Sequence, residues 1–94
     1  MKVENMISKS SGRPVANQFN IWDGSLVYFQ SYSTIIVKID RGNRDSGEQV
    51  YLDANKWDYS RTTGKYRNQF LGETKKETQA KIDSGEYVLT DLNS

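Results

Sequence analysis

The spacing of apolar residues changes partway along this chain of 94 residues, and that change limits the folds open to it. From Val15 to Asp53 apolar residues alternate with polar ones, which is the period of half-buried β-strands. From Tyr59 to Phe70 they recur every three or four residues, which is the period of an amphipathic helix. We therefore predict a small α+β domain: an antiparallel sheet, formed by a β-meander plus a C-terminal strand, with two short helices in the C-terminal half.

The alternating stretch divides into four expected strands. Asp23-Gly24 is a strong two-residue hairpin signal, because a type I′ turn needs positive φ at both of its central positions. This turn would place Ile21 opposite Leu26. It also places four apolar side chains on one face of the hairpin: Phe19, Ile21, Leu26 and Tyr28. Residues 34–39 and 49–53 are the third and fourth strands, and they complete the meander.

The expected hairpin is apolar on both sides. Trp22, Val27 and Phe29 lie opposite the first apolar face, because successive side chains of a strand point to opposite sides. We therefore expect the hairpin either to be covered on both faces or to engage a partner with one of them. The third strand is expected to point three residues into the core: Ile35, Val37 and Ile39.

Two segments are expected to lack regular structure. Residues 1–14 contain a polar, serine-rich run and are predicted to form a flexible lead-in, which leaves residues 15–94 as a single domain. Within the lead-in, Met6-Ile7 could dock on the core or self-associate, but a frayed terminus is the simpler account. Residues 40–47 combine mixed charges with two glycines and predict a mobile loop.

The first predicted helix follows the fourth strand. Ser60 or Asp58 can cap it, because a short side-chain oxygen accepts from a free amide of the first turn. Gly72 is placed to end it in a left-handed conformation. Its expected apolar stripe consists of Tyr59, Thr63, Tyr66 and Phe70. Arg61, Lys65 and Asn68 are expected on its outward face, with Arg67 near the edge of that face.

The second predicted helix begins with a capping box. Thr74 and Glu77 have the spacing at which each side chain reaches the other residue's backbone amide. The helix should run to about Ser84, with Gly85 as its stop. A closing strand from Tyr87 then returns to one edge of the sheet.

The amino-acid composition argues against several classes of function. The chain has neither cysteine nor histidine, so the usual zinc ligands and the usual general base at neutral pH are absent together. We therefore predict that it is not an enzyme and that it needs no metal and no cofactor. No apolar run approaches the roughly 20 residues of a membrane span, and we expect a soluble, cytoplasmic protein that does not engage the membrane.

Charge is concentrated in one segment, residues 54–76. It carries six cations and two acids, which gives it a charge of +4, while the net charge of +1 leaves −3 for the rest of the chain. Aromatic residues are interleaved with these cations, which is typical of a binding surface. The predicted binding residues are Lys56, Trp57, Tyr59, Arg61, Lys65 and Arg67.

Three readings of this segment compete with one another. In the first, the cations hold phosphates and the rings of Trp57, Tyr59 or Tyr66 stack on nucleic-acid bases. In the second, the same residue types form the hot spot of a protein interface, and the hairpin that is apolar on both sides adds weight to a protein surface or a homodimer. The structural alternative is that Tyr59, Tyr66 and Phe70 are the buried stripe of the helix and the cations its solvated face.

A catalytic reading is weaker than these three. Ser60 and Lys65 could form a nucleophile and base pair only if the lysine were desolvated enough to be neutral, and a lysine on an exposed helix face is not.

Several short motifs resemble a family of short phage and prophage proteins of unknown function. They are Phe29-Gln30-Ser31-Tyr32, Trp57-Asp58-Tyr59-Ser60 followed by Thr62-Thr63 and Lys65, and Phe70-Leu71-Gly72-Glu73. The resemblance extends over nearly the whole chain from about Met6. It implies an accessory gene product that acts in the cytoplasm of a bacterial host, on a host or defence component.

The residues and the resemblance together predict a non-catalytic phage accessory protein that binds a host target. Its concrete form is inhibition of a nucleic-acid-handling defence complex, an anti-CRISPR action. The alternative is a small protein that binds single-stranded nucleic acid with the same segment. The oligomeric state is left open.

Overall fold

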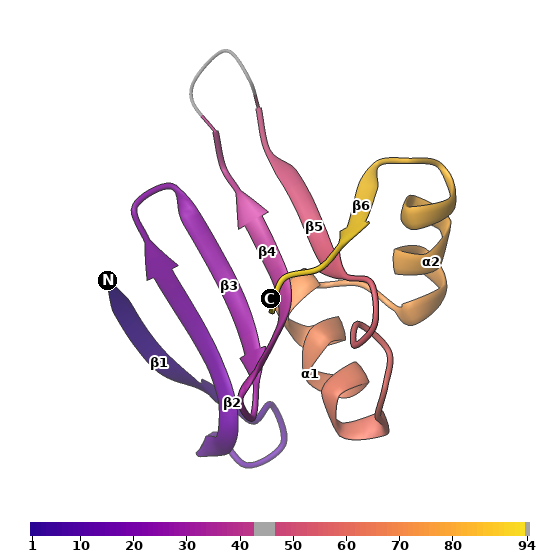
Figure 1. Ribbon diagram of the computed structural model, residues 1–94. Coiled ribbons are helices and arrows are strands. Elements are labelled where there is room, and N and C mark those ends of the chain that lie inside the picture. The colour runs from indigo at the N-terminus through magenta and orange to yellow at the C-terminus, as the bar shows by residue number, and fades with distance from the viewer. Residues whose placement is uncertain (43–46, 94) are drawn as a thin grey trace.

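The computed structural model describes residues 1–42 and 47–93 of the chain. In this described part the fold is a sheet of six strands, in the order β1-β2-β3-β4-β5-β6, with two helices between β5 and β6 (Figure 1). The elements are β1 Lys2–Ile7, β2 Pro14–Asp23, β3 Leu26–Ser31, β4 Thr34–Asp40, β5 Gln49–Asp53, α1 Arg61–Leu71, α2 Lys75–Asp83 and β6 Tyr87–Thr90. The predicted α+β fold is confirmed.

Neighbouring strands from β1 to β5 are antiparallel, as in a meander, whereas β6 pairs in parallel with β5. The parallel pairing follows from the connection, because α1 and α2 carry the chain back to the starting end of β5 before β6 begins. β6 therefore returns to one edge of the sheet, as predicted.

β1 differs from the flexible lead-in expected over residues 1–14. Lys2 pairs with Trp22 and Val3 with Ile21 along β2. An irregularity between Asn5 and Ile7 lies at Met6, which is 3% exposed and belongs to the core. This polar stretch is ordered by its backbone pairing with β2 and by the burial of one side chain. Neither feature produces a clear apolar period within six residues, so the sequence did not predict this strand.

The β2–β3 hairpin turns one residue later than predicted. Asp23 lies opposite Leu26, so the two turn residues are Gly24 and Ser25. Gly24 has a φ of 64°, while Ser25 stays in the ordinary negative region, which fits a glycine-first type II′ turn. The shift changes which residues of β2 and β3 pair with each other, but it does not change which side of the sheet each side chain faces. Ile21, now opposite Tyr28, keeps its predicted face.

A bulge in β4 corrects the expected orientation of one isoleucine. Phe29 lies opposite Val37, but Gln30 lies opposite Ile35, so Ile36 is an extra residue on this strand. Ile36 and Val37 are both fully buried, whereas Ile35 keeps accessible surface. The expectation that Ile35 points into the core is therefore wrong, because a simple two-residue period cannot anticipate an inserted residue.

Both helices begin and end at the predicted signals. The Ser60 hydroxyl accepts from the Thr63 amide at 3.1 Å, and Gly72 adopts the left-handed conformation with φ at 70°. The capping box of α2 is complete, with Thr74 and Glu77 each accepting from the other's amide. These contacts are local, which is why the sequence predicts them.

The helices cover one face of the sheet, which we call the inner face. Its core residues Phe29, Val37 and Leu52 are completely buried, and Phe70 of α1 stacks on Phe29 at 5.7 Å between ring centroids. Ile82 of α2 packs on the same cluster. Figure 1 shows the two helices together toward the β5–β6 end of the sheet.

Two further expectations concern the loop and the membrane. Residues 43–46 of the predicted loop lie outside the described residues. Within the described part, neither helix has the length and the apolar content needed to cross a bilayer.

Candidate functional site

The predicted binding residues lie on α1 and on the turn that leads into it. The turn starts at the end of β5, where the amides of Lys56 and Trp57 donate to the carbonyl of Asp53 at 3.3 and 3.0 Å. Ser60 then caps α1, which fixes where the side chains of the first turn project. A strand end and a capped helix therefore position the candidate site.

Arg67 is a buried structural residue. Its side chain is 1% exposed, and Nη1 donates to the Trp57 carbonyl at 2.7 Å and to Asp58 Oδ1 at 3.2 Å. The guanidinium lies across Gly64, where an added Cβ would meet Nη2 at 3.6 Å. Arg67 was expected near the edge of the outward helix face. The structure corrects this, because the guanidinium folds back under the turn to reach the Trp57 carbonyl and Asp58.

Trp57 is half-buried and packs against the core cluster. The Arg67 guanidinium sits 5.1 Å from the centroid of its ring, so one ring face is already occupied by a cation. The tryptophan therefore joins the turn to the core, and it offers less ring surface to a partner than the sequence suggests.

Asp58 balances part of the local positive charge. Its two carboxylate oxygens contact Arg67 Nη1 at 3.2 Å and Lys75 Nζ at 2.6 Å. Partial burial alone would raise the pKa of Asp58, but the hydrogen bonds and charges of Lys75 and Arg67 outweigh it and lower the pKa below its ordinary value. Asp58 therefore stays ionised and holds both cations in place.

Four predicted residues remain outward: Lys56, Tyr59, Arg61 and Lys65. Tyr59 is 45% exposed, and Lys56 Nζ lies 5.2 Å from the centroid of its ring. Arg61 and Lys65 are exposed on α1, four residues apart and so on one side of the helix. Lys56, Arg61 and Lys65 form no ion pair with any residue that the structure describes. We call these four residues the cationic surface.

A hollow of about 410 Å³ lies beside the cationic surface. Among the residues that line it are Arg61, Lys65, Asn68 and Lys75. Such side chains donate charge-assisted hydrogen bonds to carboxylate or phosphate oxygens. Sequence reasoning missed Lys75 as a lining residue, since its position beside Asp58 depends on how α2 packs against α1.

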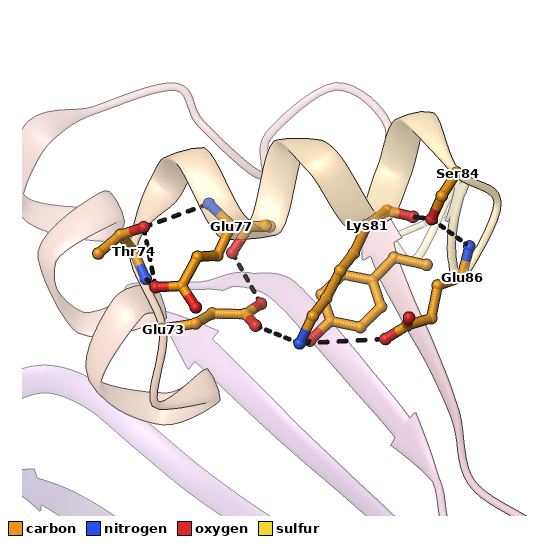
Figure 2. Close-up of polar contacts among 8 residues, drawn as sticks. Glu73, Thr74, Glu77, Lys81, Ser84 and Glu86 are labelled. Atoms are coloured by element: carbon orange, nitrogen blue, oxygen red, sulfur yellow. Dashed lines mark hydrogen bonds and ion pairs between the residues drawn. The ribbon is translucent and has the colours of Figure 1, made fainter.

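A second cluster of titratable side chains joins the α1–α2 corner to β6 (Figure 2). The carboxylate of Glu73, whose side chain is 4% exposed, accepts from Lys81 Nζ at 2.7 Å and from the Thr78 hydroxyl at 2.8 Å. Lys81 Nζ also lies 5.3 Å from the centroid of the Tyr87 ring. Sequence reasoning did not select this cluster, because its members are spread over residues 73–87.

The protonation states in this cluster are fixed at neutral pH. Burial alone would raise the pKa of Glu73, but hydrogen bonds from Lys81, Tyr87 and Thr78 and the charge of Lys81 lower it overall. The hydrogen bond to Glu73 raises the pKa of Lys81 above its ordinary value. Burial, and then the hydrogen bond and charge of Glu73, raise the pKa of Tyr87 to about 12. In these states Glu73 is negative and Lys81 is positive, so charge-assisted hydrogen bonds join the α1–α2 corner to α2 and β6.

Comparison with known proteins gives a family but no function. A model described as a family of unknown function (DUF8033) matches residues 1–86. Neither a curated protein nor a solved structure matches the chain. Among the residues that the structure describes, no three acidic side chains gather to hold a metal ion.

Proposed function

This chain belongs to the DUF8033 family, whose function is unknown, and we propose from its surface that it is a non-catalytic phage accessory protein that binds an anionic host target. The cationic surface is the proposed contact. The concrete role is inhibition of a nucleic-acid-handling defence complex in the bacterial cytoplasm. The resemblance of its motifs to short phage proteins supports the phage setting.

One observation carries the proposal: three cations and an aromatic ring are held outward on a rigid base without acidic partners among the described residues. Arg67 and Asp58 hold the turn beneath them, with Arg67 Nη1 2.7 Å from the Trp57 carbonyl. A surface that is ordered before it binds loses less conformational entropy on binding. Tyrosine and arginine are also the residue types that dominate interface hot spots.

The proposed partner is a protein with acidic residues on its surface. Arg67 is buried and paired and Lys75 is paired with Asp58, so the cationic surface itself offers three cations to a partner: Lys56, Arg61 and Lys65. Three phosphate contacts alone would make nucleic-acid binding weak at physiological salt. Carboxylates on an acidic protein accept bidentate hydrogen bonds from Arg61, and an apolar neighbour can pack on Tyr59.

Binding of single-stranded nucleic acid is the second candidate, and the exposed ring of Tyr59 favours it. A base could stack on that ring while Lys56, 5.2 Å from its centroid, contacts a phosphate. The partly covered ring of Trp57 is a poorer second platform. This candidate therefore relies on one stacking position rather than three.

The test is capture of partners from a bacterial host lysate, with and without nuclease treatment. We expect a protein partner that survives nuclease and is lost with the variant Arg61→Ala/Lys65→Ala. The variant Arg13→Ala/Arg41→Ala removes the same number of cations elsewhere and should retain the partner. Loss of all partners after nuclease would refute protein binding in favour of nucleic acid.

Salt dependence separates the two candidates independently. Contact with three phosphates of a single strand gives a slope of about −2 in log affinity against log salt concentration. A protein contact anchored by Tyr59 should respond more weakly to salt. Equal affinity of the wild type and Arg61→Ala/Lys65→Ala for the captured partner would remove the cationic surface from the site.

A further inference from the structure

The outer face of the sheet, opposite the helices, carries a band of apolar side chains. In the strand register, one row crosses all six described strands on this face: Val3, Ile21, Tyr28, Lys38, Tyr51 and Val88. A second row contains Asp23, Leu26, Asp40 and Gln49, and a third contains Asn5, Phe19, Gln30 and Ile35. No described helix covers this face, and Val3 and Val88 are 55% and 38% exposed.

This composition departs from that of a solvated sheet face. An antiparallel sheet with one face in water normally alternates apolar residues inward with polar residues outward. Here the outward positions of β2 and β3 include Phe19, Ile21, Leu26 and Tyr28, all of which keep accessible surface. The hairpin is thus apolar on both sides, but the helices cover only one of its faces.

Lys38 and Asp40, the two outward charges of the central strand β4, identify what fits the outer face, whereas a third outward charge, Asp23, lies at the turn end of the β2–β3 hairpin. Lys38 and Asp40 lie two residues apart on β4 and point to the same side, so they are separated by about 7 Å along the strand. Consider two copies stacked with their outer faces together and related by a two-fold axis that lies between the two sheets. The axis runs perpendicular to the strands and passes midway between Lys38 and Asp40. Lys38 of one copy then lies opposite Asp40 of the other, and Asp40 lies opposite Lys38.

We infer that the outer face binds a second copy of this chain, face to face, as a two-fold symmetric dimer. Two packed sheets lie about 10 Å apart, a distance that a lysine and an aspartate span together. In this arrangement Tyr28 of one copy packs on Leu26 of the other, beside the charge pairs. The pattern is that of an interface centre at which the two charges of β4 are paired, while Asp23 stays at the exposed end of the hairpin. The inference is independent of the proposed function, since the cationic surface lies on α1.

Reversing these charges tests the dimer and its register together. The mass of the purified protein would be followed by sedimentation and light scattering over a concentration series. We expect a dimer for the wild type, and a dissociation constant raised about tenfold or more for Lys38→Glu, because two pairs become repulsive. The double variant Lys38→Glu/Asp40→Lys should dimerise again, because the exchanged charges remain complementary across the axis.

Two controls make the outcome decisive. Lys2→Glu makes the same charge change on the inner-face side of β1, opposite Trp22, and should leave the dimer unchanged. Thermal unfolding of each variant shows whether the fold is retained. A monomeric wild type at all concentrations would overturn the inference, whatever other partner the face then binds. Failure of the double variant to recover association, with its fold intact, would overturn it as well.

Discussion

Replacing Glu73 with alanine removes the acceptor on which the α1–α2 corner and β6 converge. In the wild type, its carboxylate accepts from Lys81 Nζ at 2.7 Å and from the Thr78 hydroxyl at 2.8 Å (Figure 2). Thr78 is completely buried, so its hydroxyl cannot turn to water once Glu73 is gone. A buried hydroxyl without a partner costs about 1–3 kcal/mol.

The ion pair adds to this cost, but less than a fully buried pair would. The Lys81 side chain is 37% exposed, and it can therefore be rehydrated when its partner is removed. The ion pair is therefore a minor contribution beside the buried hydroxyl. The expected loss is thus about 1–3 kcal/mol, which for a domain of this size corresponds to a fall in Tm of about 4–24 °C.

The assay is urea denaturation of the wild type and Glu73→Ala at neutral pH, followed by tryptophan fluorescence. Glu86→Ala is the matched control, because Glu86 also faces Lys81 but at 3.9 Å and with 62% of its side chain exposed. It should cost no more than about 0.5 kcal/mol. If Glu73→Ala were no more destabilising than Glu86→Ala, the reasoning on the buried acceptor would be refuted.

Three further predictions concern single residues. The pKa of Glu73 is lower in the folded state than its ordinary value of 4.5, so the stability it contributes is complete above pH 4.5 and lost as the pH falls through the folded value. The stability difference between the wild type and Glu73→Gln should thus shrink in acid, and a difference unchanged from pH 7 to pH 3 would contradict this. Arg67→Ala should cost about 2–5 kcal/mol, because it truncates a fully buried side chain and leaves the Trp57 carbonyl without its donor, while Asp58 keeps Lys75. Arg67→Lys should recover little, because one ammonium cannot replace the guanidinium fork. Substitutions of the two glycines within and just after α1 should have opposite effects on stability. Gly72→Ala, at φ 70°, should lower it by about 1 kcal/mol, while Gly64→Ala, with ordinary contacts from 3.6 Å, should raise it by about 0.5–1 kcal/mol. Thermal unfolding would measure both, and effects of equal sign would contradict the assignment.

The candidate site was predicted in outline and corrected in its details. Helical spacing identified α1 and placed Arg61 and Lys65 on its outward face, where they are exposed. The same spacing placed Arg67 near that face, yet the structure buries it under the turn. Helical geometry fixes the direction in which a side chain leaves the helix. It does not fix where a long, flexible side chain ends, and the position of Asp58 and the Trp57 carbonyl decided that.

What the sequence alone determined is local: the capped ends of both helices, the strand alternation and the shared face of Phe19 and Tyr28. These features depend on residues a few positions apart, whose geometry the backbone imposes on its own. Only the tertiary structure decided the rest. The pairing of β1, the bulge at Ile36, the burial of Arg67 and the Glu73 cluster all need segments distant in the chain to meet. Their energies arise from burial and from partners that no short stretch of sequence contains.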